Sequence, residues 1–393
     1  MTKNAVCYLD NAATTYPKPE RVINEVEKCM RTYCGNPGRG AHSLSLAAAN
    51  KIYDCRCAAA RLIRSDMPEN IFFVPNTTYG LNMIIKGILK DGDHVIISDM
   101  EHNSVYRPVY KMAMEGKISF DVFNALGIAE KEKPSAEKIC SEIQKLIKKN
   151  TKLLICNHSS NICSFSLPIE EIGKLCKRNN IIFAIDAAQS AGHSDLNIRK
   201  MQINFLCAPG HKALYGPQGS GFVAINDDNT ILETLIEGGN GIESLSGEMP
   251  LFSPERYESG TVSTPCIAGL CEGIGEVLNI GVNTIGEYEN FLFDRLLDNL
   301  CNIKNITVYA PEYKGGTLLF NISGFASDAV ASVLNKQGIC VRGGFHCTAL
   351  AHKSLKTPSH GAVRASFGIF NTVEDIDKLS YACGNIKSLL DGL

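Results

Sequence analysis

The 393-residue sequence has almost no net charge, because 39 lysines and arginines oppose 41 aspartates and glutamates and leave −2 at pH 7. It also has no basic block, so the electrostatic surface that nucleic-acid binders need is missing. Apolar runs long enough to span a membrane are missing too, and the first fifteen residues contain no apolar core of a signal peptide. We therefore expect a cytoplasmic protein that binds neither nucleic acid nor membrane.

Apolar residues make up 45% of the chain and charged residues 20%, proportions that are typical of a folded globular protein. A chain of this length is too long to fold around a single hydrophobic core. We therefore expect two domains, or one large domain with an appendage.

Sixteen cysteines could form a disulfide framework in a short secreted protein, but in a long chain without an export signal we expect reduced thiols. Some, such as Cys156 in LLICNH and Cys340 in GICVRGG, lie in apolar stretches where a thiol acts as a small hydrophobic side chain. Cys55 and Cys57 form a lone pair, with no second Cys or His pair at finger-like spacing. We expect no metal site.

Short apolar runs alternate with amphipathic ones from about residue 70 onward. In SAEKICSEIQKLIKK, for example, Ile139, Ile143, Leu146 and Ile147 recur at helical spacing. The expected strands are 70–74, 94–98, 118–123, 152–157, 181–186 and 221–226, and the helices between them are 77–90, 101–116, 135–149 and 168–180. This alternation predicts an α/β protein with a mainly parallel central sheet covered by helices, which binds ligands at the carboxyl ends of its strands.

The pattern changes after the glycine-rich stretch 237–250. We expect a helix around 262–300, a strand in 316–323, a helix in 327–337 and a smaller C-terminal α/β domain. The predicted large domain spans residues 15–260, and the small domain combines residues 1–14 with 261–393.

The segments IIFAIDAAQSAG and FLCAPGHKALYGPQGSGF are the most informative for chemistry. Asp186 ends an apolar strand, Gln189 follows it, and Lys212 stands among glycines at the end of another short strand. Asp186 by itself could be an ordinary turn or capping residue. Together with Lys212 it matches what pyridoxal phosphate needs, namely a lysine for its aldehyde and a carboxylate for its pyridinium nitrogen. A dinucleotide site is not supported, because no G-x-G-x-x-G lies between a strand and a helix here.

Eight motifs spread along almost the whole chain make a more specific case. They are GNPGRGAHSLS, NTTYGLN, MEHNS, NHSSN, IDAAQSAGH, GHKALYGPQGSG, RYESGT and VRGGFHC. In kind and order they resemble the class V, fold type I pyridoxal-phosphate enzymes, and within these the type II cysteine desulfurases. The resemblance implies the fold type I architecture and pyridoxal 5'-phosphate as cofactor.

The resemblance also implies roles for residues around the cofactor ring. Lys212 would bind the cofactor covalently, and Asp186 would keep the pyridine nitrogen protonated. Gln189 would donate a hydrogen bond to the phenolic oxygen of the ring. His102 would stack on the ring face and pass a proton to or from the substrate, although a lone histidine at a helix start is more often a solvated residue.

A second set of residues would hold the phosphate. Thr77 and Thr78 open a helix directly after a strand, where free backbone N–H groups attract an anion, although such threonines are also ordinary helix caps. His211 is similar to another phosphate ligand of the family. Thr261 resembles the residue that reaches the phosphate of a neighbouring subunit, which implies a homodimer.

On the substrate side, Arg364 resembles the arginine that binds the carboxylate of the amino acid, a task that suits its bidentate guanidinium. The alternative is a structural ion pair. Asn161 would contact the same carboxylate or the ring substituent, and His42 and Arg342 would border the pocket.

Cys347 differs from the other cysteines because Arg342 and His346 precede it in a glycine-containing turn, and such neighbours lower a thiol pKa. By resemblance it is the nucleophile that takes sulfur from L-cysteine and passes it to an acceptor, which could be a sulfur-carrier protein. Lys212 would remove the substrate α-proton, and L-alanine would leave.

Two positions depart from the family pattern. Pro209 replaces the usual serine or threonine two residues before His211, so one phosphate hydrogen bond is missing or supplied elsewhere. Phe345 stands where many type II enzymes have a second histidine. Three alternatives stay open at this point: a selenocysteine lyase, a class V aminotransferase, and a cofactor-binding regulator without turnover.

Overall fold

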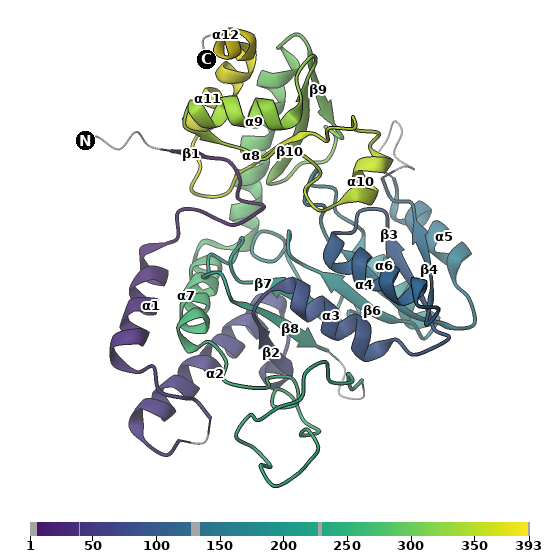
Figure 1. The fold of residues 1–393 in the computed structure, drawn as a ribbon, viewed down its shortest axis with the longest axis vertical. Helices are drawn as coiled ribbons and strands as arrows, with labels where there is room; N and C mark the ends of the chain where they lie inside the picture. Colours follow the sequence, from purple (N-terminus) through teal and green to yellow (C-terminus); the bar gives the residue numbers. More distant parts are fainter. Residues whose placement is uncertain (1–5, 39, 127–133, 227–229, 392–393) are drawn as a thin grey trace.

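The computed structural model describes residues 6–38, 40–126, 134–226 and 230–391. Its largest element is a seven-stranded sheet with the order β2-β8-β7-β6-β5-β3-β4 (Figure 1). In this sheet β8 runs antiparallel to both of its neighbours, and the other strands are parallel. The strands are β2 (Ile71–Val74), β3 (His94–Ser98), β4 (Ser119–Phe123), β5 (Thr151–Asn157), β6 (Ile182–Asp186), β7 (Phe205–Pro209) and β8 (Gly221–Ile225). The mainly parallel sheet that the sequence predicts is confirmed.

Successive side chains of each strand enter two different hydrophobic clusters, one on each face of this sheet. Ile97 and Leu153 pack with α3 and α4 on one face, whereas Ile96 and Leu154 pack with α2, α5, α6 and α7 on the other. The strands read as continuous apolar runs because both of their faces are buried. The helices are α2 (Ser43–Ile63), α3 (Thr77–Ile88), α4 (Asn103–Met114), α5 (Ala136–Leu146), α6 (Ile169–Arg178) and α7 (Thr264–Ile280).

The single helix that the sequence predicts around 262–300 is wrong. Two helices occupy this range, α7 and α8 (Val282–Cys301), and they are bent by 78° at Gly281. Gly281 has φ of +93°, a conformation that glycine adopts readily and that ends α7. The bend turns the chain out of the large sheet's helical layer and into a second core.

This second core surrounds a three-stranded antiparallel sheet with the order β12-β10-β9. Strand β1, near the start of the chain, joins it by pairing in parallel with β11. Figure 1 shows these elements together at the top of the molecule, and α1 (Glu20–Thr32), α2 and α7 beside the large sheet below. The elements are β1 (Cys7–Tyr8), β9 (Ile306–Tyr309), β10 (Thr317–Ile322), α9 (Ser327–Lys336), β11 (Ile339–Cys340), α10 (Ala349–Ser354), β12 (Val363–Ser366), α11 (Val373–Gly384) and α12 (Ile386–Asp391).

The predicted domain division at residue 260 stays a prediction. Ile267, Leu270 and Ile274 of α7 belong to the cluster beneath the large sheet, whereas Leu292 and Leu296 of α8 belong to the second core. This packing favours a boundary at Gly281. In the part of the chain that the structure describes, no single helix is both long enough and apolar enough to span a membrane. Among the described helices, only α7 and α8 taken together, with the 78° bend between them, reach that length and hydropathy.

Candidate active site

A cavity of about 410 Å³ lies at the carboxyl ends of the central strands, between the large sheet and the second core. Eleven of the thirteen predicted site residues line it. They are Thr77, Thr78, His102, Asn161, Asp186, Gln189, His211, Lys212, Arg342, Cys347 and Arg364. The two that lie elsewhere are His42 and Thr261. A volume of this size is in the range of small-molecule sites in enzymes.

Lys212 and Asp186 form the buried electrostatic centre of this cavity. Burial lowers the pKa of Lys212 to about 8, although the charge of Asp186 opposes this shift. Burial raises the pKa of Asp186, and the backbone N–H of Ala188 offsets part of the increase by donating to its Oδ1 at 2.9 Å. A substantial fraction of Lys212 is therefore a neutral amine near pH 7 to 8, the form that attacks an aldehyde or accepts a proton.

His102 is held at the first turn of α4. Its Nδ1 accepts a hydrogen bond of 3.1 Å from the backbone N–H of Ser104, so the proton of the neutral ring sits on Nε2. Burial and the nearby charge of Lys212 lower the pKa of His102 to about 4. The ring is therefore uncharged at neutral pH.

The opposite end of the cavity is suited to an anion. Thr77 begins α3, after the N-cap Asn76, whose side chain accepts from the backbone N–H of Tyr79 at 2.9 Å. The buried atoms Thr77 Oγ1 and His211 Nδ1 have no hydrogen-bond partner among the described residues. Burial lowers the pKa of His211 to about 4. Helix N-termini and free donors of this kind bind phosphate groups, and the pyrrolidine of Pro209 ends β7 nearby without adding a donor.

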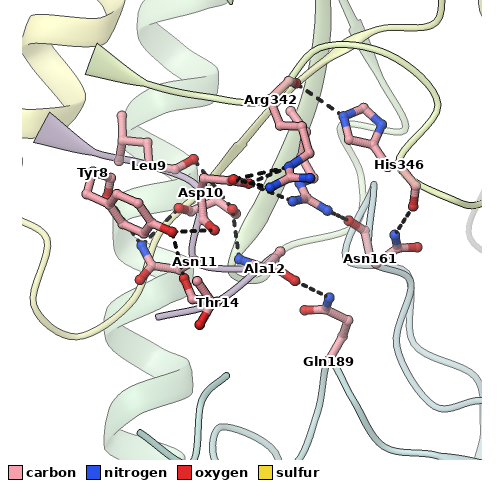
Figure 2. Close-up of polar contacts among 12 residues, drawn as sticks. Tyr8, Leu9, Asp10, Asn11, Ala12, Thr14, Asn161, Gln189, Arg342 and His346 are labelled. Carbon is pink, nitrogen blue, oxygen red and sulfur yellow. Dashed lines mark hydrogen bonds and ion pairs between the residues drawn. The ribbon is translucent and has the colours of Figure 1, made fainter. Parts of the chain in front are cut away.

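The carboxylate of Asp10, which the sequence analysis missed, connects Arg364 with Arg342. Figure 2 labels Asp10 and Arg342. Oδ1 of Asp10 accepts a hydrogen bond of 2.8 Å from Arg364, and its Oδ2 accepts one of 2.8 Å from Arg342. Arg364 also donates to the carbonyl of Asn161 at 3.0 Å, and its buried Nε has no partner among the described residues. The guanidinium of Arg364 is therefore fixed at the cavity wall, and its Nε–H is left for a further acceptor.

The side-chain amides of Asn161 and Gln189 already have hydrogen-bond partners within the chain. The amide of Asn161 donates to the carbonyl of His346 at 2.9 Å and accepts from the hydroxyl of Thr348 at 2.7 Å. Gln189 donates to the carbonyl of Ala12 at 2.9 Å (Figure 2). Their roles as ligands stay predictions, and Asn161 also positions the loop that contains Cys347.

The Cys347 loop is an unusual piece of backbone. His346 and Cys347 have φ values of +51° and +57°, a left-handed conformation that costs non-glycine residues energy. The backbone N–H of Asn103 holds the loop by donating to the carbonyl of Cys347 at 2.8 Å. The thiol is exposed and lies at the mouth of the cavity.

His346 does not supply a charged imidazole to this thiol. It is buried, its Nδ1 lies 3.2 Å from Nε2 of His352, and its Nε2 lies 3.2 Å from the carbonyl of Arg342. Burial lowers the pKa of His346 to about 3. The imidazole of His346 is therefore uncharged at neutral pH, and Arg342 is a cation that lines the cavity with Cys347.

Glu101 is a second functional candidate that the sequence analysis missed. It is fully buried, and its Oε1 accepts hydrogen bonds from the Ser98 hydroxyl and from the backbone N–H of Asn157. Burial raises the pKa of Glu101 to about 8, and the charge of Asp186 adds to the increase. At neutral pH this carboxyl is therefore mainly protonated. Glu101 could have been found from the sequence, because it closely follows the apolar strand β3 and a carboxyl in such a place is buried.

His42 and Thr261 lie close to each other on another part of the molecule. His42 caps α2 by accepting from the backbone N–H of Ser45 at 3.2 Å. Ser45 donates to the carbonyl of Asn36 at 2.7 Å, and the amide of Asn36 lies 3.4 Å from the hydroxyl of Thr261. Thr261 lines a separate cavity of about 650 Å³.

Comparisons with known proteins agree with this geometry. The family model described as Aminotransferase class-V matches residues 7–379, and the chain belongs to this family. A probable cysteine desulfurase of Pyrococcus abyssi is 33% identical over 384 residues, which cover 95% of this chain and 92% of the relative. A cysteine desulfurase of Yersinia pseudotuberculosis is 30% identical and covers 98% of this chain and 94% of the relative.

Solved structures give the same result. The apo structure of the cysteine desulfurase from Thermococcus onnurineus matches with a TM-score of 0.88 and 32% identity, over 99% of this chain and 96% of that one. A cysteine desulfurase from Escherichia coli matches in fold, with a TM-score of 0.85 and 22% identity, over 99% of this chain and 96% of that one. The fold is that of the pyridoxal-phosphate fold type I enzymes.

Proposed function

We propose that this protein is a cysteine desulfurase that uses pyridoxal 5'-phosphate to convert L-cysteine into L-alanine and to transfer the sulfur to Cys347. The observation that supports this best is one cavity shared by the buried pair Lys212 and Asp186 and the exposed thiol of Cys347. We further propose that it works in the cytoplasm as a homodimer.

The residues of the cavity fit the cofactor. Lys212 would bind the aldehyde, Asp186 would face the pyridine nitrogen, and the neutral ring of His102 would lie against the cofactor ring. The unpartnered atoms of Thr77 and His211, together with the N-terminus of α3, would hold the phosphate. When bound, pyridoxal phosphate withdraws electrons from the α-carbon of the amino acid.

The residues of the chain then divide the chemistry between them. Arg364 binds the substrate carboxylate, and the neutral amine of Lys212 removes the α-proton. The Cys347 thiolate attacks the substrate sulfur, so that an S–S bond forms while the C–S bond breaks and its electrons stay with carbon. The carbon is reprotonated and L-alanine leaves; the thiol of Cys347 has become a persulfide, and no external oxidant is needed.

The neighbouring positions of His42 and Thr261, away from the cavity, support the homodimer. Large apolar side chains are exposed nearby, among them Leu251 and Phe252 of the segment before Thr261 and Leu44 at the start of α2. Such a surface is typical of an interface between subunits. In the dimer, His42 and Thr261 of one subunit would complete the cavity of the other.

The decisive experiment incubates the cofactor-loaded protein and a thiol reductant separately with L-cysteine, with L-selenocysteine, and with pyruvate and an amino donor, and it measures alanine together with sulfide or selenide. Equal amounts of both products are expected, with persulfide trapped on Cys347 when the reductant is withheld. Alanine from pyruvate without sulfide would identify an aminotransferase. Turnover of selenocysteine but not cysteine would identify a selenocysteine lyase, and no turnover of any substrate would leave a cofactor-binding regulator.

A further inference from the structure

A groove of about 880 Å³ lies along α3 and α4, on the outer side of Cys347. It is continuous with the cavity of the candidate active site, because Thr78, His102, Ser104 and Cys347 line both. The contact between the N–H of Asn103 and the carbonyl of Cys347 places the thiol where α4 begins. A chain lying in this groove therefore reaches the thiol at one end.

The groove is basic although the protein is not. Five of its side chains are cationic and two, Asp91 and Glu115, are anionic, which gives 5 − 2 = +3 against −2 for the whole chain. The cations are Lys86, Lys90, Arg107, Lys111 and Lys117. They come from both helices and from the turns that follow them, so they line the groove on both sides.

These cations are available to a ligand. Lys90, Lys111 and Lys117 form ion pairs with Glu233 or Glu115, but their side chains are 61%, 74% and 52% exposed. Ion pairs of this exposure contribute little and exchange readily for another anion. Lys86 and Arg107 are exposed as well.

We propose that this groove, which we call the α3–α4 groove, binds an acidic, extended segment of a sulfur-acceptor protein and brings the cysteine of that segment to Cys347. This inference rests on the proposed function, because it concerns how the sulfur bound to Cys347 is transferred from the enzyme to its acceptor. The acceptor thiolate attacks the outer sulfur of the Cys347 persulfide. The S–S bond breaks, Cys347 leaves as a thiolate, and the acceptor becomes the persulfide.

The dimensions favour a short protein segment over nucleic acid. A helix of 12 residues such as α4 is about 18 Å long, the length of five or six extended residues. Acidic residues within about six positions of the acceptor cysteine would therefore face the groove cations. An oligonucleotide would extend beyond the groove over a molecule whose net charge is negative.

The test uses the cofactor-loaded enzyme and two synthetic peptides of about ten residues, each with one cysteine at its end. One peptide contains three aspartates within about six residues of the cysteine, and in the other these are replaced by glutamine. Persulfide transfer is expected to show a KM about tenfold lower for the acidic peptide, and the difference should vanish near 0.5 M salt because the charges are screened. Equal KM values at low salt would overturn the proposal.

Charge reversal locates the effect in the protein. The double variant Lys86→Glu, Lys111→Glu changes the groove charge from +3 to −1 and should remove the preference for the acidic peptide. Alanine production with a small reductant should stay within about twofold, since neither lysine lines the catalytic cavity. The matched control is Lys145→Glu, Lys336→Glu, which reverses two exposed lysines in the last turns of α5 and α9 and should behave as the parent. A control variant that lost the preference equally would overturn the proposal.

A measurement of peptide binding tests this inference independently of the proposed function. A fluorescent acidic peptide with serine in place of cysteine needs no catalysis, so its anisotropy reports on the groove even in a protein that makes no alanine. Alanine production without charge-dependent binding would reject the groove alone. Displacement of this peptide by an equal-length oligonucleotide of higher affinity would assign the groove to nucleic acid and reject the acceptor segment.

Discussion

The carboxylate of Asp10 and the guanidinium of Arg364 lie 2.8 Å apart, although 354 residues separate them in the chain. The pairing of β1 with β11 brings the start of the chain to this position, and the same carboxylate also accepts from Arg342 (Figure 2). The side chain of Arg364 is 3% exposed and that of Asp10 is 13% exposed. Asp10 therefore neutralises a buried cation and prevents two arginines from repelling each other at the substrate end of the cavity.

Replacing Asp10 by asparagine should loosen this arrangement. The amide would retain an acceptor oxygen but not the charge, so we expect Asp10→Asn to raise the KM for cysteine about tenfold with a smaller change in kcat. The free energy of unfolding should fall by about 3 kcal/mol. Steady-state kinetics and urea unfolding measure the two effects.

An exposed pair provides the control. Arg295 donates two hydrogen bonds to Asp377, at 2.8 and 2.7 Å, and both side chains are more than 40% exposed. Asp377→Asn should therefore cost less than about 1 kcal/mol and leave KM unchanged. If the two substitutions have equal effects, Asp10 has no special role in the site.

Glu101 predicts a dependence of stability on pH. Its folded pKa of about 8 lies above the ordinary value of 4.5, so between these pH values the folded state holds a proton that the unfolded state has released. The free energy of unfolding should therefore fall as pH rises from 4.5 toward 8, by up to about 1.4 kcal/mol per pH unit from this group. Glu101→Gln keeps a neutral side chain of the same shape and should remove this slope. Chemical unfolding at pH 6 and pH 8 compares the two proteins, and identical slopes would show that Glu101 is ionised in the fold.

Lys212 predicts how cofactor binding depends on pH. Because burial lowers its pKa to about 8, the neutral fraction of Lys212 rises about tenfold per unit below pH 7 and levels off above pH 8. The rate at which cofactor-free protein regains covalently bound cofactor should follow this curve, whereas an ordinary lysine would continue to gain up to about pH 10. Lys212→Ala should lose the covalent product and all turnover.

Lys18 is the internal control for this assignment. Burial lowers its pKa to about 8 as well, but its ammonium donates to the carbonyl of His211 at 2.7 Å and to the hydroxyl of Thr15 at 2.6 Å. Borohydride reduction followed by digestion should therefore label Lys212 and not Lys18. A label on Lys18 would contradict the assignment.

The sequence predicted the large sheet well because its strands are buried on both faces and read as continuous apolar runs. It did not predict β9, where Ile306 and Val308 are only partly buried and the pattern is weak. The sequence also predicted α7 and α8 as one helix, because a single glycine does not interrupt helical periodicity. Only the backbone conformation at Gly281 shows the bend.

The residues of the candidate site could also be predicted only in part from the sequence. Lys212 and Asp186 were predicted from their places at strand ends, because parallel strands bring their carboxyl ends together. Thr77 was predicted from the resemblance of its motif, and all three residues line one cavity. Asp10 was missed because its partners lie more than 300 residues away. The neutral state of His346 was missed because neither burial nor the contact with His352 can be read from the motif alone.

The proposed dimer predicts complementation between inactive subunits. If His42 and Thr261 serve the neighbouring cavity, a hybrid of a Lys212→Ala subunit with a His42→Ala, Thr261→Ala subunit contains one intact site. Random mixing should then restore about a quarter of the parent activity, because half of the dimers are hybrids with one of two sites intact. A monomeric mass at full activity, or no recovery after unfolding and refolding the mixture, would contradict shared sites.

Cys347 separates cysteine chemistry from selenocysteine chemistry. The thiol of the substrate is mostly protonated at neutral pH, and its C–S bond needs a nucleophile at sulfur before it breaks. A selenol is more acidic and its bond to carbon is weaker, so selenium can leave unaided. Cys347→Ala should therefore bind the cofactor normally and form no alanine from cysteine, yet form some from selenocysteine.

Two other results for Cys347→Ala would lead to different conclusions about this residue. Cysteine turnover at the parent rate in Cys347→Ala would make Cys347 an ordinary thiol and remove the basis of the proposed function. Loss of both activities with the cofactor still bound would show that Cys347 also donates a proton to the departing selenium. The side chains beside Cys347 allow a test of this proton donation. Phe345 is 47% exposed and has no proton to donate. Both ring nitrogens of His346 already have partners, His352 and the carbonyl of Arg342. Phe345→His, in the Cys347→Ala background, should then restore selenocysteine turnover but not cysteine turnover, which measurements of alanine from each substrate would decide.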